Sequence, residues 1–367
     1  MLEKILIIGS GIVGACFAYH ARLQGIKKIT IVANALSGEK SLATSNSWGW
    51  VNGYASNDKS YAAFRLASLQ YWPEFIKSIN NVSPTSLGAF FWDQEETEIA
   101  KTIDQHKNWG HAVELKNGLE IKKILSAFKI LPTRAGFGKN DLAIEGIKAS
   151  TEIIKASGCE VIKEDVSEII YDNHQRVGVK LLTGIIDADE VIIAAGLGSP
   201  KLLSTIGVDF EMKSSFGLLA YTNPLPSILQ FPVTGLDFHA RQDDEGRLII
   251  GGRFDDDDIN EKNVQIAAEK LVRDMTSMLN YNGNVKLDRY TLGERPLPID
   301  GRPKIGRLKN HLQQEIKGIY LAVMHSGITN APLASKLGLE EIISGKRHDM
   351  LSDFTPQKKT KEKVMNV

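Results

Sequence analysis

Three glycines near the N-terminus have the spacing of a turn that binds a dinucleotide. In the stretch GSGIVG, Gly9, Gly11 and Gly14 follow the apolar run KILII. The first glycine of such a turn permits the tight bend, the second lets a pyrophosphate approach the backbone, and the third lets the next helix pack closely on the strand. That helix directs its free N-terminal amides at the phosphates. The predicted phosphate-binding turn consists of Gly9, Ser10, Gly11, Ile12, Val13 and Gly14.

The next predicted strand, residues 28–32, lacks the acidic residue expected at its end. A carboxylate there accepts a hydrogen bond from the ribose, worth about 1.5–3 kcal/mol, but the sequence has Ala33 followed by Asn34. We expect Asn34 or the backbone to contact the ribose instead. No arginine follows closely, so a 2′-phosphate is not favoured. The missing acid favours a long cofactor held by several segments over a loosely bound NAD.

Short apolar strands alternate with helical segments, as in an α/β fold with a parallel sheet. The intervening segments are more polar or alternate with period two, as in antiparallel sheets. We therefore predict a Rossmann-like nucleotide-binding domain with an inserted mixed or antiparallel β-sheet domain for the substrate. The predicted elements are strands at 4–8, 28–32, 160–162, 190–195 and 318–323, a hairpin within 166–182, and helices from the glycine turn to Gly25, from Asn140-Asp141 to Gly158 and over 331–343.

The domain boundaries follow from the same patterns. The nucleotide-binding domain is predicted to comprise residues 1–75, 136–205 and 301–354, and the inserted substrate domain residues 76–135 and 206–300. The lysine-rich end, residues 355–367, lacks apolar spacing and is predicted to be a flexible tail.

The composition narrows the classes of partner. The chain has 44 Lys and Arg and 44 Asp and Glu residues, so it offers no general positive field to nucleic acid or an acidic membrane. No apolar run reaches the ~18 residues of a membrane span, and no signal peptide is evident. Cys16 and Cys159 form neither a disulfide framework nor a metal-ligand set. The acidic run at 254–260 lacks calcium-loop spacing and is predicted to be a solvated turn. We expect a cytoplasmic enzyme without a metal and with a small-molecule substrate.

Four separated stretches carry a family resemblance. They are GSGIVGA (9–15), ATSNSWGWVN (43–52), VIIAAGLGSPKLL (191–203) and GERPLPIDGRPKIG…GIYLAVMHSGITNAP (293–332). In order and spacing the chain resembles the FAD-dependent amine and amino-acid oxidoreductases of the D-amino-acid oxidase, glycine oxidase and sarcosine oxidase kind. The resemblance implies FAD, a two-domain fold, and hydride transfer from a C–N bond to flavin N5.

The resemblance also implies which residues surround the FAD. The polar stretch 44–49 is implied to wrap the phosphates and the flavin face, and the 196–198 turn to approach the cofactor closely. The turn at 325–327 is implied to stabilise negative charge near flavin N1, the alternative being an ordinary helix cap. Beyond the glycine turn, the implied cofactor residues are Ala33, Asn34, Thr44, Ser45, Asn46, Ser47, Trp48, Gly49, Val166, Ala195, Gly196, Gly198, Arg295, His325, Ser326, Gly327, Ile328 and Thr329.

The cysteine positions bear on how the flavin is held. Several sarcosine oxidase relatives attach flavin to a cysteine in the C-terminal third, whereas the last cysteine here is Cys159. The flavin is therefore expected to be non-covalently bound.

Arg295 is the leading candidate for holding a substrate carboxylate. It matches the position at which glycine oxidase and its relatives bind that group, and the planar guanidinium pairs bidentately with carboxylates. The alternative is an arginine that fixes the 293–302 loop through backbone carbonyls and Asp300.

Further polar side chains of the inserted sheet could line the pocket. His239 and Arg241 lie two residues apart in a predicted strand and so share a face; the alternatives are a satisfied or exposed histidine and a cross-strand ion pair. Tyr221 could reach over the flavin or pack in the core. Arg253 is a weaker candidate, and His325 could act through its side chain or its backbone alone.

The sequence thus predicts an FAD-dependent oxidoreductase that oxidises the C–N bond of an amino acid or N-substituted amino acid. Oxygen or another acceptor would take the electrons. One alternative is a flavin-binding subunit of a hetero-oligomeric opine- or sarcosine-type dehydrogenase, so a partner subunit or a homo-oligomer is considered. Another is an NAD-linked dehydrogenase, against which the stretches 191–203 and 318–332 argue. An RNA-modifying flavoprotein is disfavoured by the balanced charge.

Overall fold

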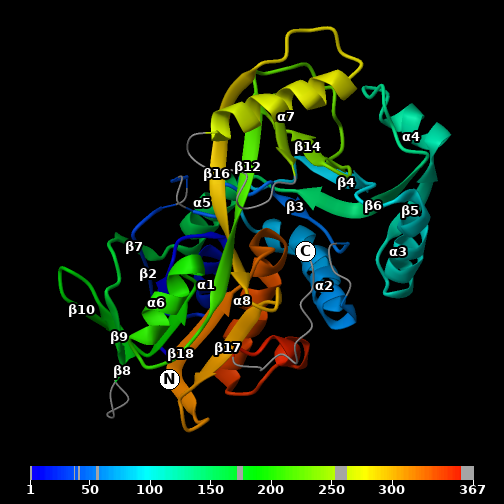
Figure 1. Cartoon of the computed structure of the whole chain (residues 1–367). Helices are drawn as coiled ribbons and strands as arrows, with labels where there is room; N and C mark the ends of the chain where they lie inside the picture. Colours follow the sequence, from blue (N-terminus) through cyan, green and yellow to red (C-terminus); the bar gives the residue numbers. More distant parts are fainter. Residues whose placement is uncertain are drawn as a thin grey trace.

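The computed structural model describes residues 2–36, 38–39, 42–54, 58–171, 177–252 and 263–356 (Figure 1). Its strands form a six-stranded, a nine-stranded and a small three-stranded sheet. In Figure 1 the six-stranded sheet and its helices occupy the lower part of the molecule and the nine-stranded sheet the upper part. Two long strands, β12 (Met212–Thr222) and β16 (Leu287–Pro298), run between the two parts.

The six-stranded sheet carries the predicted phosphate-binding turn. Its strand order is β17-β18-β11-β1-β2-β7, and every neighbouring pair is parallel except β17 with β18. After the exposed Lys4, the central strand KILII is apolar and buried, because a parallel sheet is covered on both faces. The bounds are β1 (Lys4–Ile8), β2 (Lys28–Ala33), β7 (Glu160–Lys163), β11 (Glu190–Ile193), β17 (Lys304–Lys309) and β18 (Glu315–Val323).

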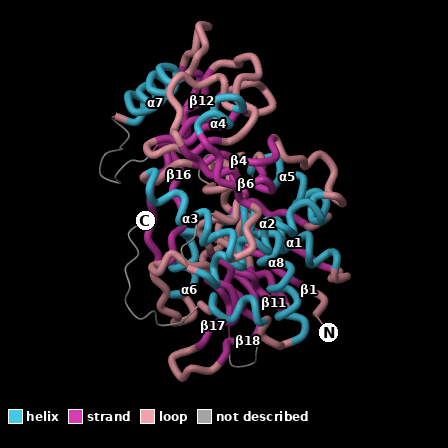
Figure 2. The backbone as a smooth tube through the Cα atoms, turned by 90° about the vertical axis from the view of Figure 1, so that its right-hand side faces the viewer, coloured by secondary structure: helices cyan, strands magenta, loops and turns pink. Residues whose placement is uncertain are grey.

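Helices cover one face of this sheet and a smaller sheet covers the other. α1 packs against α5 and α8, and α2 packs on α8 (Figure 2). On the opposite face, Val179 and Leu203 are buried against Val191. These layers comprise α1 (Ile12–Leu23), α2 (Lys59–Ile76), α5 (Gly146–Ser157) and α8 (Gly327–Ser344) on one side, and β8 (Glu168–Tyr171), β9 (Val177–Lys180), β10 (Ile185–Ala188) and α6 (Ser199–Ser204) on the other.

The nine-stranded sheet is mixed. Its order is β16-β12-β15-β14-β13-β4-β6-β3, with β5 paired to β6, and only β13 with β4 is parallel among the pairs that the structure describes. Helix α7 (Val264–Met278) covers one face, where Leu218, Ala240 and Ile250 are buried. The other elements are β3 (Trp50–Val51), β4 (Ser86–Phe91), α3 (Glu96–Asn108), β5 (Val113–Asn117), α4 (Gly118–Ile124), β6 (Arg134–Ala143), β13 (Val233–Thr234), β14 (Phe238–Gln242) and β15 (Leu248–Gly252).

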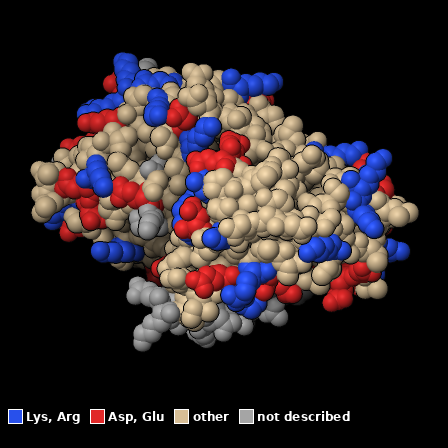
Figure 3. Space-filling view, turned by 90° about the horizontal axis from the view of Figure 1, so that it is seen from above, with Lys and Arg blue, Asp and Glu red and all other residues tan. Residues whose placement is uncertain are grey.

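Charged side chains of both signs lie side by side on the surface. Figure 3 shows lysine and arginine interspersed with aspartate and glutamate over the face that it displays. Within the described residues, no helix is long and apolar enough to cross a membrane.

The predicted fold class and strands are confirmed, but one predicted helix start is wrong. Residues 134–143 form a strand, and the helix begins at Gly146 rather than after Asn140-Asp141. Asp141 is buried in that strand, where its carboxylate accepts a hydrogen bond from Trp50 Nε1 at 3.1 Å and lies 3.3 Å from His111 Nε2. The sequence thus predicts Asn140-Asp141 as a helix cap, but in the structure Asp141 makes buried polar contacts within a strand.

The last helix starts four residues earlier than its apolar spacing predicts, at Gly327 rather than Ala331. Gly327 and the buried Asn330 interrupt the apolar period in its first turn. The domain boundaries stay a prediction: β3 lies within predicted segment 1–75 and β6 crosses position 135, yet both belong to the nine-stranded sheet. Arg253, the acidic run at 254–260 and most of the predicted tail fall outside the described residues.

Candidate active site

The predicted cofactor segments meet at one edge of the six-stranded sheet. Parallel pairing aligns Ile8 with Val32 and Ile193, so these strands end together. The glycine turn follows β1, the Ala33–Asn34 pair ends β2, Val166 follows β7, the 195–198 turn follows β11, and the 325–329 turn follows β18. In open α/β sheets, ligands bind outside the carboxyl ends of parallel strands. One edge therefore gathers segments that lie far apart in the sequence.

The glycine turn is shaped so that side chains cannot enter it. Gly9 has φ +114°, and a Cβ there would collide with the Ala194 carbonyl. A Cβ at Gly14 would collide with the Gly9 carbonyl oxygen, and one at Gly11 would lie 3.1 Å from Thr44 Oγ1. Each glycine thus serves close approach of backbone to backbone or to a ligand. Ser10 is buried and donates to the Ala35 carbonyl at 2.5 Å.

Two helix N-termini lie together at this edge. A Cβ on Gly327, the first residue of α8, would lie 3.6 Å from Val13 and 3.7 Å from Ile12, which starts α1. Within the described part of the chain, neither helix has a hydrogen bond from its own N-cap side chain or an acidic residue in its first turn, and the first amide of α1 donates to Thr44 Oγ1. The other amides at these two helix starts and their positive dipole ends are suited to an anion.

The polar stretch after β2 lies against the glycine turn. Thr44 Oγ1 accepts a hydrogen bond from the Ile12 amide at 3.0 Å, and Thr44 and Ser45 are both buried. Gly49 has φ +81°, and a Cβ there would collide with the Ile144 carbonyl. The buried indole N–H of Trp48 has no acceptor among the described residues. A polar group brought by a cofactor would satisfy this donor, so these residues fit a bound flavin nucleotide.

Ala33, which stands at the end of β2 where an acidic residue is expected, is packed against neighbouring residues. Ala33 is 7% exposed, and its carbonyl accepts from the Glu164 amide at 3.0 Å, whereas Asn34 next to it is exposed. An Asn34 contact to the ribose is sterically open. It stays a prediction.

The remaining cofactor candidates line the same edge. Val166 and Ala195 are partly buried, and Gly196 has φ +54° in a short 3₁₀ turn with Gly198. Asn46 donates to the Leu42 carbonyl at 2.9 Å, and Ser47 Oγ accepts from the Gly49 amide at 3.1 Å. Thr329 donates to the Trp50 carbonyl at 3.4 Å, the Ile328 carbonyl accepts from Trp72 Nε1 at 3.0 Å, and Ser326 precedes the helix as its cap residue.

The predicted substrate residues of the inserted sheet share one face. Strand register places His239 opposite Gly251 and Leu219, and Arg241 opposite Ile249 and Tyr221. In β16, Arg289 pairs with Tyr221 and Arg295 pairs with Ser215 of β12. Because side chains alternate between the two faces of a sheet, Arg295 lies on the same face as Arg289 and therefore as Tyr221. These four candidates, His239, Arg241, Tyr221 and Arg295, thus point away from α7 and toward the nucleotide-binding half.

Glycines open this face. A Cβ on Gly217 would lie 2.6 Å from Arg295 Nη2, and one on Gly251 would collide with the His239 ring. A Cβ on Gly293 would collide with the Asn46 side chain, which comes from the nucleotide-binding half. Three glycines on neighbouring strands therefore make the room that larger polar side chains occupy. The sequence prediction did not include them, although Gly in a strand signals such close approach.

Contacts with β12 hold the Arg295 side chain on this face. Its Nη1 donates to the Phe216 carbonyl at 2.8 Å and lies 3.5 Å from Ser215 Oγ. The side chain is only partly buried. This backbone contact is to the neighbouring strand β12, whereas Asp300, the other partner in the alternative interpretation, pairs with Lys304 at 2.7 Å. The carboxylate role stays a prediction.

Two histidines stand near Arg295. Burial, followed by the charge of Arg295, lowers the pKa of His239 from 6.5 to about 3. Burial, then Arg295, then Arg65 lower the pKa of His325 to about 4. His325 is nevertheless an exposed residue, so the part of the pKa shift caused by burial is the weaker argument and the neighbouring positive charges are the stronger one. Both rings are neutral at pH 7, and both face a region of positive potential.

Arg241 and Tyr221 are engaged within the protein. Arg241 is 2% exposed, pairs with Glu145 at 2.5 Å and donates to the Trp48 carbonyl at 2.6 Å. Glu145 lies between β6 and α5, so this is not the cross-strand pair considered from the sequence. Tyr221 is buried, with the Arg289 guanidinium 3.6 Å from its ring centroid. Its contacts are those of a packed side chain.

Arg65 is a residue that sequence reasoning missed. It lies on α2 and is 1% exposed, with two guanidinium nitrogens that have no partner among the described residues. The signal was present: Arg65 occupies the same helical stripe as Tyr61 and Leu69, four residues away on either side, where only apolar side chains are expected.

Comparison with known proteins agrees with this geometry. The family described as FAD dependent oxidoreductase matches residues 4–340. The chain belongs to this family. It is an oxidoreductase with FAD as its cofactor, as the sequence predicts. Among curated relatives, the chain is 25% identical to glycine oxidase of Bacillus licheniformis over 355 residues, 92% of each chain, and 22% identical to a subunit of the opine oxidase of Rhizobium meliloti over 373 residues, 96% of each.

Solved structures of the family have the same fold. Iminodiacetate oxidase from Chelativorans sp. BNC1 matches with a TM-score of 0.80 at 19% identity, covering 96% of this chain and 98% of that one. The family assignment makes the NAD-linked alternative unnecessary, because the cofactor of this family is FAD. The described residues include no group of three or more side chains arranged to hold a metal ion.

Proposed function

We propose that this oxidoreductase oxidises the C–N bond of an amino acid or N-substituted amino acid to an imine, which water then hydrolyses. The observation that carries the proposal is the placement of Arg295 beside His239 and His325, on a sheet face that points at the cofactor edge. Bound FAD supplies the acceptor for the hydride. The task of the protein is then to hold the substrate amine with its Cα–H directed at the cofactor.

The roles of individual residues follow from their charge. Arg295 binds the substrate carboxylate by charge-assisted hydrogen bonds. His239 and His325 are neutral at pH 7 because their pKa values are lowered to about 3 and about 4. Neutral imidazoles add no repulsion to a substrate ammonium and can accept its hydrogen bond. The free amides at the start of α8 stabilise negative charge near the cofactor ring.

The relatives support this substrate class. They include glycine oxidase, a subunit of opine oxidase and iminodiacetate oxidase. Glycine and iminodiacetate each join an amine and a carboxylate in one compound. This supports amino acids as the general class but not a particular side chain, chirality or N-substituent.

Anaerobic reduction of the flavin tests the proposal. The purified, FAD-loaded protein is mixed with glycine, sarcosine, proline, D- and L-amino acids and opines, and the loss of yellow absorbance is followed. We expect bleaching by at least one amine carrying a carboxylate and none by the matching amine without it. Hydrogen peroxide formed on admitting air identifies an oxidase, whereas its absence with turnover on a dye identifies a dehydrogenase. Bleaching by simple amines alone contradicts the assigned role of Arg295.

The covalent state of the flavin is part of the proposal. Cys16 is fully buried and its pKa is raised by burial, and the pKa of Cys159 is also raised by burial. Neither thiol has the low pKa of a reactive cysteine. We infer non-covalent FAD in a cytoplasmic enzyme, so denaturation should release all of the flavin into the supernatant.

A second candidate is a flavin-carrying subunit of a larger oxidase. It is supported by the match to the opine oxidase subunit along 96% of both chains. Native mass measurement and the turnover of the isolated chain separate the two. Full turnover by an isolated monomer or homo-oligomer contradicts this second candidate.

A further inference from the structure

A buried guanidinium on α2 is only partly hydrogen-bonded. Arg65 Nη2 donates to Asn52 Oδ1 at 2.8 Å, while Nε and Nη1 have no hydrogen-bond partner among the described residues, and the side chain is 1% exposed. The N–H groups on those two nitrogens therefore lack acceptors. A guanidinium remains charged in proteins, and burying an unpaired charge is strongly unfavourable. Arg65 is thus a cation whose counter-ion is not supplied by the described part of the chain.

The contacts of Arg65 place it at the candidate active site. Its guanidinium carbon lies 5.6 Å from the Tyr61 ring centroid, and Tyr61 Oη accepts from Asn330 Nδ2 at 3.3 Å. Asn330 belongs to the first turn of α8, whose start carries His325 and Ser326. A helix N-terminus repels a neighbouring cation and attracts an anion, so this location makes an anionic partner for Arg65 more favourable.

Two guanidinium groups act on His325 from different halves of the molecule. Arg295 belongs to β16 of the nine-stranded sheet and Arg65 to α2, and after burial both charges lower the pKa of His325. Two cationic side chains from different halves of the molecule therefore influence the same histidine.

Other buried polar atoms around Arg65 also lack partners among the described residues. Both ring nitrogens of His106, which is 0% exposed, and Nδ1 of His111 make no hydrogen bond there, nor does Asn330 Oδ1. The charge of Arg65 reaches His106, since it helps burial and His111 to lower the pKa of that ring. Buried polar atoms are almost always satisfied in native proteins. A polar ligand group next to Arg65 would supply acceptors for the N–H groups that the described residues leave unsatisfied.

We propose that the substrate of this oxidoreductase carries two carboxylates, one bound by Arg295 and the second by Arg65. The inference rests on the proposed function, which it narrows to amines with two acidic arms. Such an amine is either an imino diacid, with both carboxylates attached through the nitrogen substituents, or an amino acid with an acidic side chain. The competing interpretation is an arginine that only holds Asn52 in place.

Binding of unreactive acids tests the second anion position without turnover. Acetate, malonate, succinate and glutarate are titrated into the FAD-loaded protein, and the dissociation constant is read from the change in flavin absorbance. We expect one diacid to bind about 10- to 100-fold more tightly than acetate, the effect of one charge-assisted hydrogen bond. Arg65→Gln should abolish that preference while leaving the acetate constant within about twofold.

A matched control comes from another arginine bound to α2. Arg302 Nη2 donates to Asp58 Oδ1 at 3.1 Å at the start of the same helix, in a contact that is made within the protein. Arg302→Gln should keep the diacid preference even if it lowers the melting temperature. Arg65→Lys, which keeps the charge, should restore part of the preference and guards against a folding defect in Arg65→Gln. Equal weakening of acetate and diacids by Arg65→Gln, or no diacid preference in the native protein, overturns the inference.

Flavin reduction by paired substrates identifies the kind of diacid. Iminodiacetate is compared with sarcosine, and glutamate with alanine, in the native protein and in Arg65→Gln. A preference for the diacid that vanishes in the variant supports the inference, and the pair that shows it names the class. If no amine reduces the flavin but diacid binding still depends on Arg65, the proposed function fails and the second anion position stands. If amines reduce the flavin with no dependence on Arg65, the inference fails and the proposed function stands.

Discussion

The two sides of the active site are built by different physical means. The candidate cofactor side consists of backbone: glycines with no room for a Cβ, helix starts and strand ends. The substrate side that we propose consists of charged and polar side chains, Arg295, His239 and Arg65, the first two placed in space made by Gly217 and Gly251. Backbone positions tolerate almost no substitution, whereas side-chain positions can change the substrate without changing the fold.

This difference suggests how the two sides should respond to substitution. A change on the cofactor side should cost flavin binding and folding together, because the same atoms form the turn and the core. A change on the substrate side should cost turnover while flavin stays bound. Four experiments, ordered from the largest expected effect to the smallest, test that separation.

The largest effect is expected from Gly14→Ala. The added Cβ would collide with the Gly9 carbonyl oxygen, so strand and helix must move apart, at a cost of about 3 kcal/mol or more in unfolding free energy. Flavin content and melting temperature should both fall. Gly25→Ala is the control: Gly25 has φ +77° with no atom within 4 Å of a Cβ, so only about 1 kcal/mol of backbone strain is expected and the flavin should remain bound. If the Gly14→Ala protein keeps its full flavin content, the idea that the same backbone atoms form the cofactor site and the core is contradicted.

The next effect is expected from Arg295→Ala. Loss of the carboxylate contact should lower kcat/KM by about 100-fold, corresponding to about 3 kcal/mol, with flavin content unchanged. Arg289→Ala is the matched control, since Arg289 lies on the same strand and face but stacks on Tyr221. Normal substrate affinity in Arg295→Ala removes the carboxylate assignment, and equal losses in both variants point to a structural effect of the strand.

Acidification should lower the unfolding free energy of the protein because His106 is buried. Burial, followed by His111 and Arg65, lowers the pKa of His106 from 6.5 to about 4. The unfolded chain therefore takes up a proton below about pH 6.5 that the folded chain refuses until about pH 4. The stabilisation is complete above that window and is lost as the pH falls through it, by about 2 kcal/mol between pH 7 and pH 5.

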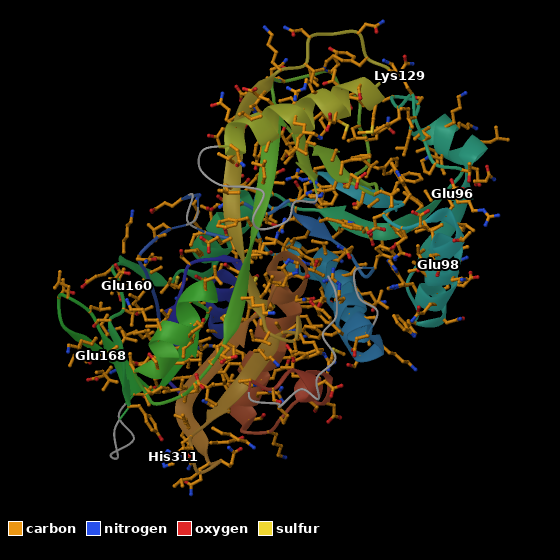
Figure 4. All side chains as sticks on the ribbon, viewed as in Figure 1. Glu96, Glu98, Lys129, Glu160, Glu168 and His311 are labelled. Carbon is orange, nitrogen blue, oxygen red and sulfur yellow. The ribbon has the colours of Figure 1, made fainter. Side chains whose placement is uncertain are left out.

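Thermal unfolding at pH 7 and pH 5 measures this loss. The fall in melting temperature should be smaller in His106→Asn than in the native protein. His311→Asn provides the comparison, because His311 is exposed on the loop labelled in Figure 4, far from the site. If the two variants lose the same stability on acidification, the burial of His106 does not govern the response.

The smallest effect is expected from Ala33→Glu. A carboxylate at the end of β2 would add a charge-assisted hydrogen bond to the ribose, raising FAD affinity by up to about tenfold, with little change in kcat/KM. Because Ala33 is buried among apolar side chains, the larger side chain should at the same time lower the melting temperature. The dissociation constant is measured by titrating apoprotein with FAD, and Asn34→Ala reports whether the neutral neighbour supplies that contact. An Ala33→Glu variant that binds FAD no better argues that ribose contacts come from elsewhere in the fold.

Local chemistry explains which elements could be predicted. β1, α1 and β2 follow from an apolar run and a glycine spacing close together in the sequence, and Gly158 ends α5 in the left-handed conformation that favours glycine. The start of α5 could not be read in the same way, because Asn140-Asp141 carries the local pattern of a cap. Pairing with the distant strands β3 and β4 makes residues 134–143 a strand, and Trp50 supplies a partner for the buried Asp141 carboxylate.

In the candidate site, too, some features follow from local sequence and others from contacts between distant segments. From the sequence alone came the FAD-binding turn, the departure at Ala33 and the candidates Arg295, His239 and His325, since each lies in a short stretch with its own signal. Only the tertiary structure decided that Arg241 is engaged by Glu145, that glycines clear the sheet face, and that Arg65 is buried with two of its nitrogens unsatisfied by the described residues. Burial and pairing depend on segments far apart in the chain, and so they are absent from any local pattern of residues.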